Sequence, residues 1–535
     1  MRNGLIIFSI LLFLSFHLSA QELHYFIGFT DKSSTSFTLD RPEEFLSQKS
    51  LLRRTKQNIS LTERDLPVSA AYLAAIRATG AKVIYTSKWV NAALVEATVN
   101  QIDEIRAFEF TKELPYVTRG MQANSLSTQE QEAYGASFGQ ADMIGLDDMH
   151  EMGYTGAGIE IAILDGGFRN ADTDQSFKDI FESERLLSTF DFVDGDENVY
   201  EASDHGRQVF SITGSFQAET MIGGAYGASF HLFRTENTAV ETRLEEIYWL
   251  LAAEKADSLG VDIILSSLGY TTFDLDEDSY TVEALDGNTA LVTVAADLAA
   301  STGMLVVTSA GNEGNDPWQK ITSPADADSV LSVGAVNQNG EYMEFSSLGP
   351  TANGRIKPEV AAQGWFTIAS NGGGGTRSTI GTSFAAPLVA SLAAGLWQAR
   401  PELNNMDIIR ILKATSSQAE NPDNLLGYGI PDFNRALEYE EVTALNAEGT
   451  LSDPEIYPNP FEVDFSIVFP ENEVGQKIDI LIFSTEGKVL FEETQFLKST
   501  TSKIRFPESI KGGVYILKLE SLKGFRTFRI IKSYY

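Results

Sequence analysis

The sequence predicts an α/β fold: a mostly parallel sheet with helices on both faces, accompanied by a small α+β domain and a C-terminal β-sandwich. Two observations lead to this class. In the central part of the chain, short apolar runs alternate with helical stretches, as in a parallel sheet covered on both faces. Near the C-terminus, short strand-like runs are separated by glycine-containing turns, as in a sandwich. A chain of 535 residues also suggests about three or four domains.

Residues 1–20 have the pattern of a secretory signal peptide. Arg2 precedes an apolar run over residues 5–16, and Ala20 is small enough for a cleavage site. The run is short for a membrane-spanning helix, which needs about twenty residues; an uncleaved membrane anchor is the alternative. Because no later run reaches about eighteen apolar residues, we expect a mature chain without a transmembrane segment.

Three further segments follow, each with its own pattern. Residues 21–125 alternate strand-like and helix-like stretches, which predicts a small α+β domain. Residues 133–440 carry the predicted parallel sheet, with strand candidates at 159–164, 261–265 and 304–308 and helical stretches at 242–259 and 383–398. Residues 453–535 form the predicted β-sandwich, with strand candidates at 465–469, 478–483, 488–491, 514–519 and 525–532.

Composition excludes several classes of function. The net charge is −34 and lies almost entirely within residues 126–450, whereas nucleic-acid binding needs clustered Lys and Arg, so we expect no nucleic-acid partner. A solvated acidic face and a cation-binding surface both remain open. The absence of cysteine excludes disulfides, thiolate metal sites and a cysteine nucleophile. Only five histidines are available to any histidine-dependent mechanism.

Two candidate site residues, Asp165 and His205, lie at the ends of predicted elements. Asp165 follows the strand candidate 159–164, and His205 opens a helix. In open parallel α/β sheets, ligands bind beyond the carboxyl ends of the strands. Taken singly, an aspartate in a glycine-rich bend is a turn former, and a histidine at a helix end is a capping or surface residue.

Ser383 and Asn312 are the other two candidates. Ser383 stands at a helix start, where an N-cap is its ordinary role. However, Gly381 permits close backbone approach, the helix N-terminus favours developing negative charge, and Pro387 is expected in the first turn, where it is tolerated. Asn312 follows the strand candidate 304–308 and either forms a turn or donates to an oxyanion.

Together these residues supply a nucleophile, a general base, an orienting carboxylate and an oxyanion donor, the groups that acyl transfer by serine requires. Their order along the chain, Asp then His then Ser, is that of one of three unrelated triad folds. The motifs that contain them resemble those of subtilisin-like serine proteases over residues 133–440: Leu164-Asp165-Gly166-Gly167, His205-Gly206, Ser267-Leu268-Gly269, Ala310-Gly311-Asn312 and Gly381-Thr382-Ser383-Phe384-Ala385-Ala386-Pro387.

The resemblance implies hydrolysis of peptide bonds through an acyl-enzyme on Ser383, with no cofactor required for the chemistry. His205 would move the proton, Asp165 would hold the imidazole, and Asn312 would stabilise the oxyanion together with the Ser383 N–H. It also implies two segments that bind substrate backbone as an added strand, or that are alternatively plain core strand. They comprise Ser267, Leu268, Gly269, Ser309, Ala310 and Gly311.

The sequence departs from the family pattern at two positions. Gly166 stands where relatives usually have Ser or Thr after the aspartate, and Arg207 stands where they usually have Thr after His-Gly. Neither residue is one of the reacting groups, so the departures bear on fine positioning and optimum pH rather than on the reaction class.

The flanking segments carry resemblances of their own. Residues 21–125 resemble the propeptides of such proteases, with cleavage expected between Val117 and Ala133; an ordinary accessory domain is the alternative. Residues 453–535 resemble the C-terminal sorting domain of the bacterial type IX secretion system, on the motifs Ile456-Tyr457-Pro458-Asn459-Pro460, Gly512 to Lys518 and Ile530-Ile531-Lys532. That likeness implies the secretion machinery as a partner and a secreted or outer-membrane surface location. A carbohydrate-binding or adhesive sandwich is the alternative.

Acidic loops at 191–197 and 274–278 offer oxygen ligands, and subtilisin-like relatives often use structural calcium. Neither loop matches a complete calcium-binding pattern, so we assign no metal ligands. The main hypothesis is a secreted serine endopeptidase made as a zymogen and acting on protein or peptide substrates. The alternatives are a surface protein that binds peptides without cutting them and an exopeptidase that releases tripeptides.

Overall fold

The structure is a computed structural model that describes residues 23–114, residues 134–439, and residues 454–532 apart from short gaps at 460, 462, 471–473, 485–488, 507–509, 511–512 and 522–523. The chain divides into two compact units, Met1–Glu438 and Tyr439–Tyr535. The expected signal peptide and the expected cleavage segment between Val117 and Ala133 lie outside the described residues. In the described ranges, every helix is too short or too polar to cross a bilayer.

The N-terminal domain is a four-stranded antiparallel sheet with helices α2 and α3. Side chains of the sheet and of both helices share one apolar core. A third helix, α1, lies between β1 and α2 and contacts α8 of the central domain. Along the chain the elements are β1 (Leu23–Phe29), α1 (Gln48–Lys56), α2 (Ala70–Ala78), β2 (Lys82–Ser87), β3 (Ala92–Ala97), α3 (Val99–Arg106) and β4 (Thr111–Glu113).

The central domain is built on a seven-stranded parallel sheet, which confirms the predicted fold class. Its strand order is β13-β12-β11-β10-β5-β9-β6, and every neighbouring pair is parallel. The strands β10, β11 and β12 are buried along their whole length, which explains their unbroken apolar runs. The strands are β5 (Glu160–Asp165), β6 (Leu186–Asp191), β9 (Ser229–Arg234), β10 (Ile263–Ser266), β11 (Leu305–Ser309), β12 (Leu331–Val336) and β13 (Val360–Gln363).

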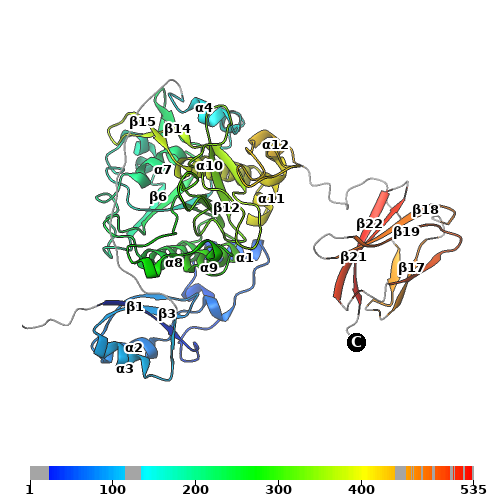
Figure 1. The fold of residues 1–535 in the computed structure, drawn as a ribbon, viewed down its shortest axis with the longest axis horizontal. Coiled ribbons are helices and arrows are strands. Elements are labelled where there is room, and N and C mark those ends of the chain that lie inside the picture. Colours follow the sequence, from blue (N-terminus) through cyan, green and yellow to red (C-terminus); the bar gives the residue numbers. More distant parts are fainter. Residues whose placement is uncertain are drawn as a thin grey trace, which may run out of the picture. The chain divides into compact units, whose positions relative to one another are not determined.

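Two pairs of helices cover this sheet (Figure 1). Helices α7 (His205–Gly214) and α10 (Thr382–Ala399) pack together on one face, and α8 (Arg243–Leu259) and α9 (Leu291–Ser301) pack together on the other. The four-stranded N-terminal sheet lies on the outer side of α8, so the same apolar cluster contains residues of both domains. The central domain thus carries the N-terminal domain on its α8–α9 face.

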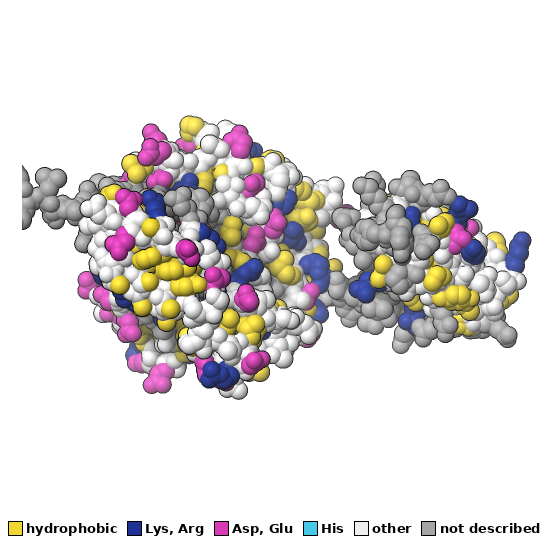
Figure 2. All heavy atoms as spheres, turned by 90° about the horizontal axis from the view of Figure 1, so that it is seen from below, with side chains coloured by type: hydrophobic (Ala, Val, Ile, Leu, Met, Phe, Trp, Pro, Cys, Tyr) yellow, Lys and Arg dark blue, Asp and Glu magenta, His cyan; other side chains and the backbone are white. Residues whose placement is uncertain are grey.

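Smaller elements complete the central domain. The hairpin of β14 (Trp365–Ser370) and β15 (Thr376–Ile380) leads into α10, and β7 (Phe216–Gln217) pairs with β8 (Met221–Ile222). The remaining helices are α4 (Phe138–Asp142), α5 (Leu146–Glu151), α6 (Lys178–Glu182), α11 (Asn405–Thr415) and α12 (Phe433–Leu437). On the face of the molecule in Figure 2, acidic side chains are spread over the larger unit rather than gathered in one patch, which is the distribution of a solvated surface.

The three strand candidates of the central domain are displaced from the observed strands by one or two residues. As a consequence, Asp165 and Ser309 are the last residues of β5 and β11, rather than residues that follow them. Helix α8 begins one residue later than predicted because Thr242 is its N-cap: the Thr242 hydroxyl accepts from the N–H of Leu244, and Glu245 accepts from the N–H of Thr242.

The C-terminal unit is an antiparallel β structure with two sheets. One has the order β16-β17-β20 and the other the order β19-β18-β21-β22, and their inward-facing residues form a shared apolar core. The sequence missed two of these strands, β16 and β20. The strands are β16 (Glu455–Tyr457), β17 (Asp464–Val468), β18 (Lys477–Phe483), β19 (Val489–Phe496), β20 (Thr501–Arg505), β21 (Gly513–Ser521) and β22 (Gly524–Lys532).

Candidate active site

Asp165 and His205 form a polar pair at the carboxyl end of the sheet. Asp165 ends β5 with a fully buried side chain, whereas His205 begins α7 with 34% of its side chain exposed. The imidazole Nδ1 lies 2.9 Å and 3.0 Å from the two oxygens of the Asp165 carboxylate. The N–H of Gly166 donates a further hydrogen bond to Asp165 Oδ1 at 2.7 Å. The carboxylate can therefore hold the Nδ1–H tautomer, which leaves Nε2 as the basic nitrogen.

The glycine after His205 is required because α7 starts directly against Asp165. A Cβ atom at Gly206 would lie 2.5 Å from the carbonyl oxygen of Gly167 and 2.8 Å from Asp165 Cβ. Any side chain at this position would push the helix away from the strand and separate the imidazole from the carboxylate.

The environment of His205 favours its protonated form. Burial by itself lowers the pKa of the imidazole, but the negative charge and hydrogen bond of Asp165, together with the charges of Asp204 and Glu236, outweigh burial and raise the pKa above its usual value. An imidazolium beside Asp165 is therefore stabilised, which is the state a general base reaches after it accepts a proton.

Ser383 lies in the first turn of α10, close to this pair. The ring of its neighbour Phe384 is 5.4 Å from the imidazole ring, measured between centroids. Among the described contacts no hydrogen bond joins Ser383 to His205; the Ser383 hydroxyl instead donates to the carbonyl of Ser267 at 3.2 Å. A change of the Ser383 side-chain rotamer redirects this hydroxyl without movement of the helix backbone.

Pro387 stands in the second turn of α10, because the helix begins at Thr382; the expectation of a first-turn proline was wrong. A proline at this position removes the N–H that would bond to the Ser383 carbonyl one turn earlier. That carbonyl accepts instead from the hydroxyl of Ser267, at 2.8 Å. Ser267 thus replaces the missing helical hydrogen bond.

Asn312 lies in the loop after β11 and faces the start of α10. Its side-chain Oδ1 accepts from the N–H of Thr382 at 2.8 Å and from the Thr382 hydroxyl at 3.1 Å. These two bonds occupy the oxygen and fix the orientation of the amide, so that the NH2 group is the donor it can present to a ligand. Gly381 permits the turn into α10, since its φ of +148° is one that other residues rarely adopt.

The two predicted substrate-binding segments lie side by side at the carboxyl ends of β10 and β11. The segment 320–323 is hydrogen-bonded to the second of them and to Tyr270, which directly follows the first. The Ser309 hydroxyl donates to the carbonyl of Leu268 at 3.4 Å. The N–H of Thr322 donates to the carbonyl of Ala310 at 3.0 Å, and Ser323 pairs with Tyr270 through backbone hydrogen bonds. Residues 320–323 therefore connect the two segments through backbone hydrogen bonds.

The side chain of Thr322 fills the space between these two segments. A Cβ atom on Gly269 would lie 2.1 Å from Thr322 Oγ1, and one on Gly311 would lie 2.7 Å from Thr322 Cγ2. Thr322 is only 2% exposed, and its hydroxyl has no hydrogen-bond partner among the described residues. Sequence reasoning missed this residue, because no motif near Thr322 marks it as part of a site.

Both departures from the family pattern have local structural reasons. A Cβ atom on Gly166 would lie 2.9 Å from the methyl group of Thr238, so the loop after β9 occupies the space that a Ser or Thr side chain would need. Arg207 is buried; its guanidinium donates to the carbonyl of Arg169 at 2.7 Å, pairs with Asp204 at 3.2 Å and lies against Gly372. Arg207 therefore supports the glycine-rich turn between β14 and β15.

Sequence reasoning also missed a buried carboxyl group close to Asp165, that of Glu236. Glu236 accepts hydrogen bonds from the hydroxyls of Tyr270, at 2.7 Å, and Thr235, at 2.9 Å. Burial, reinforced by the nearby charge of Glu241, raises the pKa of Glu236 above its usual value. Glu236 and Asp165 come together because β5 pairs with β9. No local sequence motif predicts this pairing.

In the acidic loop at 191–197, two carboxylates pair with an arginine of β9. The guanidinium of Arg234 pairs with Asp191 at 2.7 Å and also with Asp194. The other oxygen of Asp191 accepts the N–H groups of Val193 and Asp194. Both oxygens of Asp191 are therefore engaged within the protein. Over the described residues, no group of three or more His, Asp or Glu side chains is arranged to hold a metal ion.

The fold and this site define a subtilisin-like protease domain, and comparison with known proteins places the chain in a family. The model of the subtilase family, Peptidase S8, matches residues 156–429. The chain belongs to the subtilase family. A model described as the Peptidase S8 propeptide domain of Bacteroidota matches residues 24–133, and one for a secretion system C-terminal sorting domain matches residues 455–533. The three resemblances predicted from the sequence are thereby confirmed.

Individual relatives agree with this assignment. The chain is 29% identical to Subtilisin NAT of Bacillus subtilis subsp. natto over 347 residues, which cover 64% of this chain and 80% of that protein. It is 30% identical to a subtilisin of Bacillus pumilus over 274 residues, which cover 50% of this chain and 87% of that protein. Among solved structures, MycP1 from Mycobacterium smegmatis is similar with a TM-score of 0.46 at 23% identity, covering 62% of this chain and 90% of MycP1.

Proposed function

We propose that this chain is a secreted serine endopeptidase, made as a zymogen, which hydrolyses peptide bonds through an acyl-enzyme on Ser383. The observation that carries the proposal is the hydrogen-bonded pair of Asp165 and His205 with Ser383 on the adjoining helix. The subtilase family membership of residues 156–429 supports the same chemistry.

In the proposed mechanism, the Ser383 hydroxyl leaves the Ser267 carbonyl and turns toward His205 Nε2. The oxygen attacks the substrate carbonyl while Nε2 takes the hydroxyl proton, and Asp165 stabilises the resulting imidazolium. The amide NH2 of Asn312 and the N–H of Ser383 donate to the oxyanion. The imidazolium then protonates the leaving amine as the C–N bond breaks. Water, deprotonated by His205, then attacks the ester carbonyl; as the ester C–O bond breaks, His205 returns the proton to the Ser383 oxygen and the acid product is released.

The substrate backbone would add as a strand beside the segments Ser267–Gly269 and Ser309–Gly311, which lie at the open carboxyl ends of β10 and β11. The side chain on the acyl side of the scissile bond, here called P1, would then enter the space between the two segments. Because Thr322 fills the floor of that space, the proposal favours short P1 side chains.

Export is part of the proposal. The sorting-domain match at residues 455–533 supports passage through a dedicated secretion system, to the medium or to the cell surface. The apolar run at residues 5–16 supports a cleaved signal peptide as the first step. The match of residues 24–133 to a propeptide model supports synthesis as a zymogen, since a tethered inhibitor acts at high effective concentration.

The decisive experiment is covalent labelling of the full chain with a fluorophosphonate, alongside hydrolysis of casein. We expect the matured wild-type protein to be labelled and to cleave casein, and the Ser383→Ala variant to do neither. Ser301→Ala changes an exposed serine and should keep both properties. If the wild type and Ser383→Ala are equally inert, the proposal of a catalytic serine fails and the alternative of a non-catalytic peptide-binding protein is the one to test.

Mass spectrometry of the products separates endopeptidase from exopeptidase activity. An endopeptidase yields internal fragments of varied length, whereas a tripeptide-releasing enzyme yields products three residues long from one end of the substrate.

A further inference from the structure

The prosegment, here residues 23–114, contacts the peptidase domain through an additional structure outside its four-stranded sheet. Residues 41–66, here called the docking arm, run between β1 and α2 and contain α1 (Gln48–Lys56). Ser47 caps the start of α1 by accepting from the N–H of Ser50 at 3.1 Å. The helix α1 contacts α8 of the peptidase domain (Figure 1).

The docking arm supplies hydrogen-bond donors to the C-terminal end of α8, where carbonyl groups have no partner within the helix. The Ser47 N–H donates to the carbonyl of Ser258 at 3.0 Å, and the Ser47 hydroxyl donates to that of Leu259 at 2.9 Å. The guanidinium of Arg53 donates to the carbonyl of Val261 at 2.6 Å, just before β10 begins.

The same arm reaches the C-terminal end of α9. Arg53 Nε donates to the carbonyl of Thr302 at 3.0 Å, and the side-chain amide of Gln57 donates to that of Gly303 at 2.9 Å. A single arginine, Arg53, thus bonds to the ends of two peptidase helices that lead into neighbouring strands, β10 and β11. Cationic donors at helix C-termini also complement the helix dipole.

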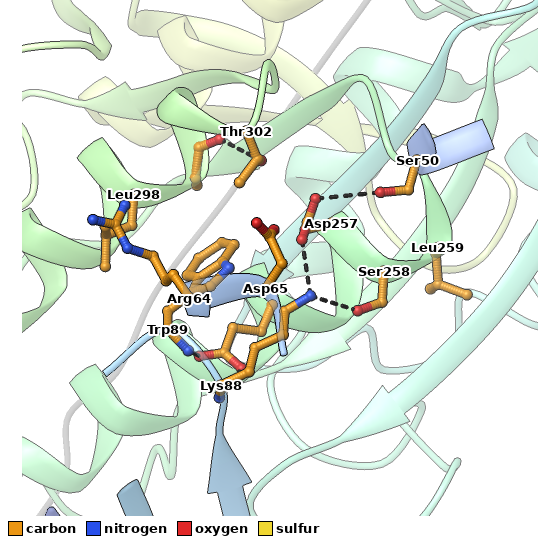
Figure 3. A network of polar contacts seen from close by, with 12 residues as sticks. Ser50, Arg64, Asp65, Lys88, Trp89, Asp257, Ser258, Leu259, Leu298 and Thr302 are labelled. Carbon is orange, nitrogen blue, oxygen red and sulfur yellow. Dashed lines mark hydrogen bonds and ion pairs between the residues drawn. The ribbon is translucent and has the colours of Figure 1, made fainter. Parts of the chain in front are cut away.

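Beneath these contacts lies a buried ion network centred on Asp257 of α8, whose side chain has no exposed surface. Figure 3 shows the bonds that Asp257 receives from Ser50 of α1 and from Lys88. Arg54 lies 2.7 Å and 3.0 Å from the two carboxylate oxygens, Lys88 Nζ lies 2.9 Å away, and Arg53 pairs with the same carboxylate. Arg54 also pairs with Asp65 of the arm at 2.8 Å. Burial alone would raise the pKa of Asp257, but the three cations outweigh it and hold the pKa well below its usual range.

The prosegment sheet meets α8 in a different way. Trp89 and Leu94 of the sheet region belong to an apolar cluster shared with α8, and Glu254 accepts the N–H groups of Lys88, at 2.8 Å, and Trp89, at 3.1 Å. The apolar part of this contact is non-directional and tolerates small displacements, whereas the two bonds to Glu254 are directional but come from neutral N–H groups. The network around Asp257 is directional, and each of its charges is desolvated only while all its partners stay in place.

We propose that the docking arm, through Arg53 and Arg54 on Asp257, sets how long the prosegment stays on the peptidase domain after the chain between them is cut. Loss of one partner from a buried, hydrogen-bonded charge pair acts mainly on the dissociation rate. After the prosegment leaves, the C-terminal ends of α8 and α9 form a binding site for a helix that carries two adjacent arginines. The ligand of this site is the docking arm of this chain. The inference does not require Ser383 to be the nucleophile.

The experiment uses the full chain with Ser383→Ala, so that no activity of its own contributes. A recognition sequence for a site-specific protease is inserted after Met121, and Asp103→Cys on the exposed side of α3 carries a fluorophore, which is unique because the chain has no other cysteine. After cleavage and dilution, fluorescence anisotropy follows release of the prosegment. We expect Arg54→Met to release at least about 30-fold faster than the parent, the effect of removing about 2 kcal/mol from a buried charge pair.

Matched variants separate this effect from a general loss of charge. Lys82→Met removes a cation of the same prosegment that pairs with Glu96, also in the prosegment, and release should change less than threefold. Asp257→Asn on the peptidase side should also accelerate release. In the double variant Arg54→Met/Asp257→Asn, the increase in release rate should be smaller than the product of the two single increases, because both substitutions remove the same ion pair. Release of Arg54→Met and Asp257→Asn within threefold of the parent would overturn the proposal.

Hydrogen exchange on the cut Ser383→Ala chain, with Arg53 and Arg54 intact, gives a second test in case Arg54→Met does not fold. If the arm holds the prosegment, the amides of α1 exchange no faster than the prosegment leaves. Exchange of α1 at least tenfold faster than release would show that the arm detaches while the sheet remains bound, and the proposal would be wrong.

Discussion

Ser267 and Ser383 exchange two hydrogen bonds: the Ser267 hydroxyl donates to the Ser383 carbonyl at 2.8 Å, and the Ser383 hydroxyl donates to the Ser267 carbonyl at 3.2 Å. The pair joins the segment after β10 to the first turn of α10. It exists because Pro387 leaves the Ser383 carbonyl without its helical partner. One residue of the proposed substrate-binding wall therefore also holds the proposed nucleophile in place.

We predict that Ser267→Ala destabilises the peptidase domain by about 1–3 kcal/mol, because it leaves the buried Ser383 carbonyl without a hydrogen bond. Denaturant unfolding of the Ser383→Ala chain, with and without the second substitution, measures the difference. Ser301→Ala, which removes an exposed hydroxyl bonded to the Leu298 carbonyl, should change stability by less than about 0.5 kcal/mol. Equal effects of the two substitutions would contradict the role assigned to Ser267.

The sequence predicted those residues of the candidate site that lie next to a recognisable strand or helix start. Asp165 ends β5, His205 begins α7 and Asn312 lies in the loop after β11. The apolar run or helix start of each element is visible in the sequence, and parallel strands bring their carboxyl ends to one edge. Thr322 and Glu236 could not be found in this way. Their roles depend on contacts with Gly269, Gly311 and Tyr270, which are set by how distant segments pack.

The same limit applied to element boundaries and to the docking arm. Apolar runs located β5, β10 and β11 within one or two residues, because burial on both faces requires them. The contacts of Arg53 and Arg54 with α8 and α9 span more than two hundred positions along the chain, and no spacing rule relates them. From the sequence alone, two adjacent arginines are expected to be exposed to solvent.

Removal of the proposed oxyanion donor should lower kcat far more than it changes KM. We expect Asn312→Ala to reduce kcat by about 100- to 1,000-fold, the range found on removing such a donor from a subtilisin. Asn312→Asp is the matched variant: it keeps an oxygen that can accept from Thr382, but it has no NH2 group to donate. Activity close to wild type in either variant, measured with a peptide substrate, would exclude Asn312 from this role.

Activity should rise with pH through the pKa of His205, because only the neutral imidazole accepts a proton. Since Asp165 raises this pKa, the midpoint of the kcat/KM profile should lie above the ordinary value of 6.5. The opposite sign holds for stability: a raised pKa stabilises the fold fully below pH 6.5, and this contribution disappears as pH rises through the shifted pKa.

The pH profile has a direct control. Asp165→Asn removes the charge that outweighs burial, so the pKa of His205 should fall, and kcat should fall by about 10,000-fold because the imidazole tautomer is no longer held. NMR titration of His205 in the Ser383→Ala background measures the pKa without turnover. A value at or below 6.5 with Asp165 intact would contradict the prediction.

Substrate preference should depend on Thr322, which lies between the walls formed by Ser267–Gly269 and Ser309–Gly311. We expect the wild type to cleave after Ala faster than after Phe in otherwise identical peptides, because the threonine side chain occupies the floor of the space. Thr322→Gly removes all of that side chain and should raise the Phe-to-Ala ratio of kcat/KM by at least about tenfold, since even one methylene group is worth about 1–3 kcal/mol in such a pocket.

Thr322→Ser provides the graded comparison, because it keeps the hydroxyl that lies against Gly269 and removes only the methyl group that lies against Gly311. Its Phe-to-Ala ratio should fall between those of the wild type and Thr322→Gly. Unfolding midpoints of the three proteins show whether a change in ratio accompanies a loss of stability, which would lower both rates together rather than their ratio. A wild-type preference for Phe, or a ratio that is unchanged across the series, would mean that P1 does not enter between the two walls.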